Sequence, residues 1–216
     1  MRADLDICES FQSSFLKLLS SDEKYRANKF RFNEDSRRFI TARGILRLLL
    51  GKYLEINPAE ITFHYGEFGK QNIENHNSFQ YNISHSQNVA LFALTKERNI
   101  GVDVEFVNPN IEAQEIAARF FANNEVKNLL ALPEKDQILG FFNCWTRKEA
   151  FIKAVGEGLS FPLDKFEVSL VPTKPAKLLA THWKSEEVFK WSIYALPPEP
   201  NFVGSVVIEG FVDKLR

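Results

Sequence analysis

Residues 82–105 constrain this chain more than any other stretch, because two acids stand in a run that is otherwise typical of a β-strand. Asp103 and Glu105 alternate with valines, and side chains two apart on a strand point to the same face. Carboxylates held side by side repel each other, and burial adds to the cost of each charge. Either a cation binds between them, or the strand ends at the surface and both acids face water.

The spacing of apolar residues predicts an α+β fold made of two similar halves. Helical patterns and then strand-like runs occur in turn at residues 11–19, 24–32, 35–55, 61–65, 79–83, 89–95 and 100–106. After a linker-like segment at residues 107–110, the same order recurs at residues 111–121, 123–132, 136–155, 166–170, 189–195 and 202–208. Each half is therefore helices followed by strands, and we expect the halves to be residues 1–101 and 102–216.

The composition is that of an ordinary globular protein and argues against several function classes. The 216 residues carry a net charge of −1, so the chain as a whole is not a binder of nucleic acids. Residues 22–52 nevertheless hold nine basic and four acidic side chains. The two cysteines form no metal or redox motif, no apolar run has the roughly 18 residues of a membrane helix, and the first residues do not resemble a signal peptide. We therefore expect a cytoplasmic protein.

Two arginines border the apolar stripe of the helix expected at residues 35–55. A projection at about 100° per residue places Arg38 and Arg43 at the two borders of this stripe, and Arg37 nearly opposite. An arginine at the border of a core can hold an anion in a cleft, or it can lay its stem along the core and keep its charge in water. Both interpretations stay open for Arg38 and Arg43, whereas Arg37 is expected to face solvent.

A second charged cluster lies in the helix expected at residues 136–155. Glu149 and Lys153 are one helical turn apart at the edge of its apolar stripe, beside Trp145. Such a pair on a surface contributes only about a few tenths of a kcal/mol, so it indicates no function by itself. Lys148 falls inside the stripe, where it either extends to the surface or reaches a buried anion.

Together these side chains suit the chemistry of phosphate groups. Asp103, Glu105 and Glu149 are oxygen ligands of the kind that hold a hard divalent ion such as Mg²⁺. Four basic side chains can complement a phosphate ligand of high charge: Arg38, Lys70, His85 and Lys153. The chain has no P-loop, no GxGxxG and no GxSxG motif, which argues against P-loop nucleotide hydrolases, Rossmann enzymes and serine hydrolases.

Two motifs at a fixed separation resemble those of the 4′-phosphopantetheinyl transferase superfamily. The family pattern is (V/I)G(V/I)D(V/I)E followed, after roughly forty residues, by (F/W)(S/C/T)xKE(S/A)xxK. Here GVDVE occupies residues 101–105 and WTRKEAFIK residues 145–153, with Asp103 and Glu149 46 positions apart. Shorter matches lie at residues 68–70 (FGK), 82–86 (NISHS) and 119–121 (RFF). The set is similar to the long, surfactin-synthetase-activating type of the family.

This resemblance implies a pseudo-dimer of two α+β halves with the active site at their interface. It implies transfer of 4′-phosphopantetheine from coenzyme A to a serine hydroxyl of an apo acyl or peptidyl carrier protein, with release of adenosine 3′,5′-bisphosphate. Asp103, Glu105 and Glu149 match the family's Mg²⁺ ligands, with Mn²⁺ as an alternative ion. Lys153 matches the lysine near the reacting phosphate, and Glu149 is also the candidate base toward the serine.

The resemblance also assigns contacts to coenzyme A. Arg38 and His85 match groups that hold its 3′-phosphate, and Lys70 and Ser84 match other contacts. The candidate coenzyme A ligands further include two side chains from the apolar stripes: Arg43 and Lys148. One departure is Gln71, which stands where many relatives have a proline after the Gly-Lys pair.

The family's partner surface lies on the helix that begins the second half, so residues 111–121 are the candidate surface for the carrier protein. The basic N-terminal segment can help to steer an acidic carrier. We expect a monomer, because one chain contains both halves of the site. Two rival functions are a Mg²⁺-dependent nuclease or phosphodiesterase, and a non-catalytic module that binds coenzyme A or a carrier. The low net charge argues against the first, and the complete set of acids with Lys153 argues against the second.

Overall fold

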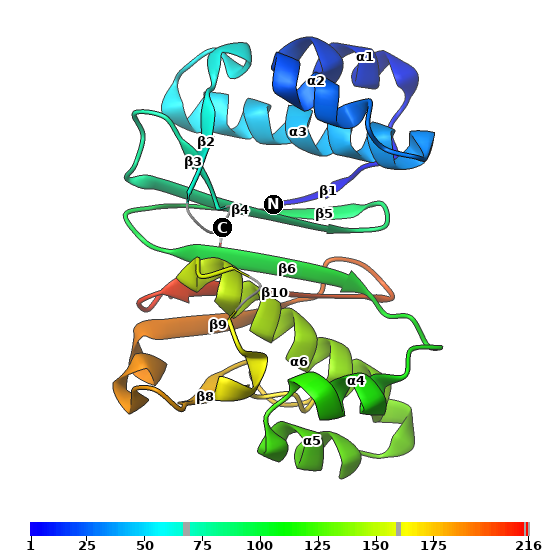
Figure 1. Cartoon of the computed structure of the whole chain (residues 1–216), viewed down its shortest axis with the longest axis vertical. Coiled ribbons are helices and arrows are strands. Elements are labelled where there is room, and N and C mark those ends of the chain that lie inside the picture. The colour runs from blue at the N-terminus through cyan, green and yellow to red at the C-terminus, as the bar shows by residue number, and fades with distance from the viewer. Residues whose placement is uncertain (67–69, 159–160, 214, 216) are drawn as a thin grey trace.

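The computed structural model confirms an α+β fold with two halves, and it describes residues 1–66, 70–158, 161–213 and 215. Four layers follow one another along the long axis of the molecule (Figure 1). The N-terminal helices form one outer layer, a sheet from each half forms the middle, and the C-terminal helices form the other outer layer. Residues 68 and 69 of the FGK motif lie outside the described residues. Within the described ranges, no helix has the length and apolar character needed to cross a membrane.

The first half places three helices over an antiparallel sheet. The helices are α1 (Glu9–Leu18), α2 (Ser21–Ala27) and α3 (Asn33–Leu54). The sheet has the order β1 (Arg2–Asp4), β5 (Val89–Lys96), β4 (Phe79–Ser86). A short 3₁₀ turn and a two-stranded ribbon complete the half: η1 (Pro58–Glu60), β2 (Phe63–Tyr65) and β3 (Gln71–Ile73).

The second half has the same kinds of element in the same order. Its helices are α4 (Ala113–Phe120), α5 (Asn123–Leu130) and α6 (Glu134–Val155). Its main sheet has the antiparallel order β6 (Ile100–Phe106), β10 (Phe202–Glu209), β9 (Trp191–Leu196). A second ribbon and two 3₁₀ turns complete it: β7 (Phe166–Val168), β8 (Leu178–Thr181), η2 (Leu163–Lys165) and η3 (Ser185–Lys190). The boundary predicted between residues 101 and 102 falls inside β6 and stays a prediction.

Strand β5 is buried on both faces, which explains its unbroken apolar run. Alternate residues such as Ala90 and Phe92 pack with α3 in the core of the first half. The residues between them, such as Leu91, pack against β6 and β10 in a core that the two sheets share. The period of two along a strand thus lets one run of residues serve two cores.

Gly101 allows helix α6 to approach strand β6 closely. A Cβ atom at this position would collide with the carbonyl oxygen of Ala150 and the amide nitrogen of Ala154. The glycine of the GVDVE motif therefore brings the helix that carries Glu149 and Lys153 against the strand that carries the two acids.

The helix predicted at residues 24–32 is wrong at its C-terminal end. Helix α2 stops at Ala27, where the Ser36 hydroxyl of α3 donates to the Ala27 carbonyl (2.8 Å). This bond satisfies a carbonyl that the helix end leaves free, and the chain turns into α3 at Asn33.

Candidate active site

Strands β4 and β6 meet between the halves through side chains. The side-chain oxygen of Asn82 accepts a hydrogen bond from the Val102 amide (2.9 Å), and the Ser86 hydroxyl accepts one from the Phe106 amide (3.1 Å). In each hydrogen bond the two partners are 20 residues apart, so residue numbers increase in the same direction along both strands. The two strands therefore run parallel here. The polar alternation of β4 thereby aligns the NISHS motif with the GVDVE motif.

Asp103 lies buried at the contact between β4 and β6, which we call the seam, with only 3% of its surface exposed. Its Oδ1 accepts hydrogen bonds from the Ser84 hydroxyl (2.8 Å) and from Lys153 Nζ (2.6 Å). Its Oδ2 is buried and has no hydrogen-bond partner among the described residues. Burial raises the pKa of Asp103 even though Lys153 opposes the shift. A buried carboxylate oxygen without a partner is costly, and a cation beside it would remove that cost.

Glu105 and Glu149, like Asp103, have pKa values raised by burial. Ser86 donates to Oε2 of Glu105 (2.9 Å). Burial raises the pKa of both glutamates, and the negative charge of Asp103 raises each further. All three carboxylates lie within electrostatic reach of Lys153. In the part of the chain that the structure describes, however, no three His, Cys, Asp or Glu side chains lie close enough together to hold a metal ion without rearrangement.

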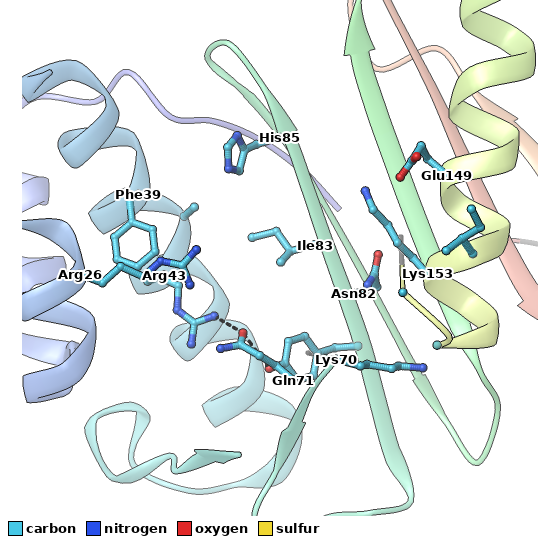
Figure 2. Close-up of a pocket in the computed structure, with 15 residues that line it drawn as sticks. Arg26, Phe39, Arg43, Lys70, Gln71, Asn82, Ile83, His85, Glu149 and Lys153 are labelled. Carbon is cyan, nitrogen blue, oxygen red and sulfur yellow. Dashed lines mark hydrogen bonds between the residues drawn. The ribbon is translucent and has the colours of Figure 1, made fainter. Parts of the chain in front are cut away.

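A cavity of about 440 Å³ opens between the halves beside these acids (Figure 2). Both halves line it, with side chains from α2, α3, β3, β4 and α6. Among the described residues, its charged lining is mostly basic: Arg26, Arg43, Lys70, His85 and Lys153, with Glu149 as the acid. The cavity therefore suits an elongated ligand that carries several negative charges.

Two basic side chains of the cavity, Lys70 and His85, have lowered pKa values. Burial lowers the pKa of Lys70. Burial also lowers the pKa of His85, and the positive charges of Lys153 and Arg38 lower it further. Bound anionic groups would counter both effects, because a negative charge favours the protonated forms.

The predicted ligands do not all line the cavity. Arg43, Lys70, His85, Glu149 and Lys153 are in its lining, and Ser84 lies beneath it against Asp103 and Lys153. Arg38 is not in the lining. Its guanidinium binds Asp6 (2.8 Å) and Glu34 (2.5 Å), while its charge is still felt at His85.

The structure contradicts the role predicted for Lys148 in binding coenzyme A. This side chain is fully buried inside the second half, away from the cavity, and its ammonium is paired with Glu125 (2.7 Å). It also donates to the carbonyls of Leu163 (2.8 Å) and Phe166 (2.6 Å). Three acceptors use all three N–H groups of the ammonium, so none is left for a ligand. The alternative that Lys148 reaches a buried anion is confirmed.

Several residues of the lining were not among the predicted ligands, and three of them bear on how the cavity could bind an anion. Arg26 belongs to the basic segment, but nothing in its spacing singled it out, because α2 is too short for a clear apolar stripe. Phe39 is an apolar side chain that nevertheless lines the cavity, and its ring centre lies 5.3 Å from Cζ of Arg26. Gln71 was noticed only as a departure from the family pattern.

Comparison with known proteins agrees with this geometry. Residues 99–207 match the family model described as the 4′-phosphopantetheinyl transferase superfamily, and residues 8–97 match the model described as 4′-phosphopantetheinyl transferase, N-terminal. The two matched ranges correspond to the two halves of the fold.

Two similar proteins are named 4′-phosphopantetheinyl transferases. The chain is 40% identical over 213 residues to the 4′-phosphopantetheinyl transferase HetI of Nostoc sp., covering 97% of this chain and 86% of the relative. It is 32% identical over 167 residues to the 4′-phosphopantetheinyl transferase Sfp of Bacillus subtilis, covering 77% of this chain and 73% of the relative. The chain therefore belongs to the 4′-phosphopantetheinyl transferase superfamily, in its long Sfp-like type, and is an enzyme of that class.

Proposed function

We propose that the protein transfers 4′-phosphopantetheine from coenzyme A to a serine hydroxyl of an apo acyl or peptidyl carrier protein. The observation that carries this proposal is the basic cavity between the halves, which ends at Lys153 and the acids of the seam. Coenzyme A is a long ligand with its negative charges in one region, and the cavity offers positive charge along its length.

Several contacts of coenzyme A follow from the lining of the cavity. Arg26, Arg43, Lys70 and His85 are the side chains that we assign to its phosphates and nucleotide end. Lys153 and Glu149 lie at the end where the two halves meet and are assigned to the reacting phosphate. Arg38 joins this set only if it exchanges its carboxylate partners for the ligand, so we place it in a supporting role near His85.

A Mg²⁺ ion, or Mn²⁺ in its place, fits the acids of the seam. The unpartnered Oδ2 of Asp103 and the raised pKa values of Asp103, Glu105 and Glu149 support this assignment, because a dication would stabilise all three ionised carboxylates. When bound, the metal supplies charge neutralisation on the phosphates.

The chain's own side chains then have separate roles in the transfer. Glu149, half-buried with a raised pKa, is the candidate to accept the proton of the carrier serine, directly or through a water. The serine oxygen forms a bond to the β-phosphorus of coenzyme A. The bond from that phosphorus to the oxygen bridging the two phosphates breaks, and this oxygen leaves as part of adenosine 3′,5′-bisphosphate. Lys153 stabilises negative charge on the phosphate oxygens, while Ser84 and Asp103 hold its ammonium in place (3.2 and 2.6 Å).

Residues 111–121 remain our candidate surface for the carrier protein. They include α4, whose exposed residues are Gln114, Glu115, Ala118, Arg119 and Phe120. A hollow beside this helix is bordered by the beginning of α6. Because this surface carries both signs of charge, we assign attraction of an acidic carrier to the basic segment around α2 and α3. Both halves of the site lie in one chain, which favours action as a monomer.

The decisive test is incubation with coenzyme A, Mg²⁺ and an apo carrier protein, followed by mass spectrometry of the carrier. We expect the carrier to gain the mass of the phosphopantetheine arm, and we expect no gain when its acceptor serine is replaced by alanine. Absence of transfer to every one of several acyl and peptidyl carriers would overturn the proposal. Cleavage of a nucleic acid in a parallel reaction would instead favour a nuclease.

A further inference from the structure

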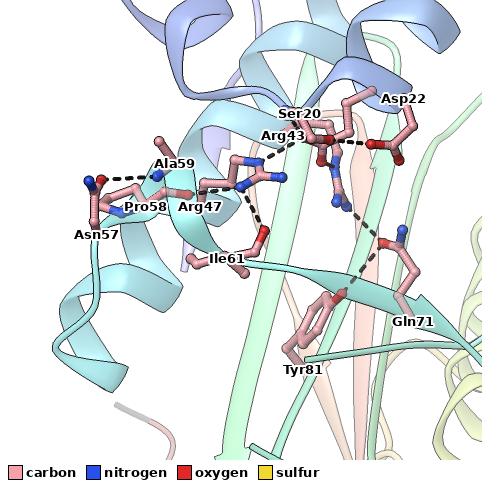
Figure 3. A network of polar contacts seen from close by, with 11 residues as sticks. Ser20, Asp22, Arg43, Arg47, Asn57, Pro58, Ala59, Ile61, Gln71 and Tyr81 are labelled. Atoms are coloured by element: carbon pink, nitrogen blue, oxygen red, sulfur yellow. Dashed lines mark hydrogen bonds and ion pairs between the residues drawn. The ribbon is translucent and has the colours of Figure 1, made fainter. Parts of the chain in front are cut away.

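The guanidinium of Arg43 is held on three sides within the lining of the cavity. Its Nε donates to Oε1 of Glu23 (2.5 Å), its Nη1 donates to Oε1 of Gln71 (2.7 Å), and its Cζ lies 4.4 Å from the ring centre of Phe63. Its remaining nitrogen, Nη2, is buried and has no hydrogen-bond partner among the described residues. Figure 3 shows the contact between Arg43 and Gln71 within this network.

The orientation of the Gln71 amide follows from the chemistry of its neighbours. A guanidinium can only donate hydrogen bonds, so the amide atom that faces Arg43 must be the oxygen. The Tyr81 hydroxyl approaches the same oxygen (3.4 Å). Gln71 therefore acts as an acceptor here, and the proline that many relatives have at this position could not take its place.

Glu23 alone would not fix the direction of Arg43. Glu23 also binds Arg47 (2.7 Å), whose guanidinium is anchored on the carbonyls of Pro58 and Ile61. The carboxylate is thus a firm partner, but it reaches Arg43 only through Nε. A single bond at Nε leaves the guanidinium free to swing about that contact, whereas the second bond at Nη1 fixes its plane. The direction of the free Nη2 therefore depends on Gln71.

We propose that Gln71 is a positioning residue for coenzyme A, holding Arg43 so that its free Nη2 donates to a phosphate oxygen. This inference rests on the proposed function, because it names how one cation of that site is oriented. Gln71 lies at the first position of β3 and lines the cavity, so it supports Arg43 from the side opposite Glu23. Fixed donors bind an anion better than mobile ones, because less freedom is lost on binding.

The test is Gln71→Met, which keeps the shape of the side chain and removes the acceptor. Because hydrogen bonds to charged groups are the strong ones, we expect the KM for coenzyme A to rise about tenfold. The kcat and the KM for the carrier are expected to stay the same, and the denaturant midpoint is expected to fall only slightly, because Arg43 keeps its ion pair with Glu23. Calorimetric titration with adenosine 3′,5′-bisphosphate should show whether Arg43 serves the nucleotide end, through the same loss of affinity. The matched control is Asn72→Ala, the next residue on β3, which is outside the lining.

A double-mutant cycle with Arg43→Met separates positioning from direct contact. Glu23 keeps Arg47 and Ser20 as partners in this variant, so the fold is expected to survive. If Gln71 acts through Arg43, adding Gln71→Met to Arg43→Met costs no further affinity for coenzyme A. Full additivity of the two losses, or an unchanged KM in Gln71→Met, overturns the inference while the wild-type protein still transfers. Failure of the wild-type protein to bind coenzyme A would instead remove the proposed function itself.

Discussion

Helix α6 carries two lysines, Lys148 and Lys153, whose ion pairs with carboxylates differ in how many of their polar groups have a partner. Lys148 and Glu125 have side chains that are 0% and 1% exposed. Lys148 has three acceptors, and Glu125 also accepts from the Ala122 and Val168 amides (2.9 and 2.7 Å). Every polar group of this closed pair has a hydrogen-bond partner. The pair links α5, α6 and residues 163–168 of the second half.

The pair of Lys153 and Asp103 is open. The Lys153 side chain is 29% exposed toward the cavity, and one oxygen of Asp103 has no partner in the part of the chain that is described. Two pairs with the same chemistry thus have different consequences. The closed pair stabilises the fold. In the open pair, the partly exposed Lys153 ammonium can bind an anionic ligand and the unpartnered oxygen of Asp103 can bind a cation.

Lys148→Met should have the largest effect on stability. Removing one partner of a closed, buried pair leaves Glu125 without its counter-ion, which costs about 3–5 kcal/mol of unfolding free energy. Urea denaturation measures the loss, and Lys135→Met on the exposed face of the same helix is the matched control with a change of at most about 0.5 kcal/mol. A Lys148→Met protein as stable as wild type would show that the closed pair has no structural role.

Asp103→Asn should separate activity from stability in the open pair. The buried charge is already costly, as the raised pKa of Asp103 shows, so losing it should leave the unfolding free energy unchanged or higher. The rate of transfer to a carrier is expected to fall by about 100-fold or more, because both the metal and Lys153 lose a charged ligand. Retention of the wild-type rate would remove Asp103 from the metal site.

The sequence predicted the fold class and many elements because their patterns are long and periodic. The core strands β5 and β6 and the long helices α3 and α6 are examples. The short strands β1, β3 and β8 were not predicted, because three or four residues give too little alternation. Their pairing depends on partners far away in the chain, as with β1, whose Ala3 pairs with Ala90.

The predictable part of the site followed from motifs, and the rest depends on geometry that spacing does not encode. Asp103, Glu149 and Lys153 were found because family motifs contain them. Lys148 was misassigned because a lysine in an apolar stripe looks the same whether its partner is a ligand or Glu125. Arg26 and Gln71 reach the cavity only through the packing of α2 and β3, which no periodic pattern indicates.

Ser84→Ala is a smaller change that loosens the open pair without removing a charge. The Ser84 hydroxyl donates to Asp103 and accepts from Lys153, so alanine leaves both side chains less constrained. A hydrogen bond of this kind contributes about 1 kcal/mol, which corresponds to a roughly fivefold fall in kcat. Single-turnover rates with excess carrier measure it, and Ser86→Ala, which acts on Glu105 instead, tests whether the effect is specific to Lys153.

The pH dependence of stability should show how burial and the charge of Lys153 affect the protonation of His85. Burial and the positive charges of Lys153 and Arg38 lower the pKa of His85 in the folded protein below its ordinary value of 6.5. The unfolded chain then binds the proton more readily, so the contribution of His85 is fully present above pH 6.5 and is lost as the pH falls from there through the folded pKa.

His85→Gln should therefore reduce the fall in unfolding free energy below pH 6.5, measured by urea denaturation at a series of pH values. Saturating coenzyme A should reduce it too, because an anion next to the imidazole raises its pKa and reverses the linkage. If the pH profile is the same in wild type and His85→Gln, then neither burial nor the charge of Lys153 lowers the pKa of His85 in the folded protein, and this prediction is wrong.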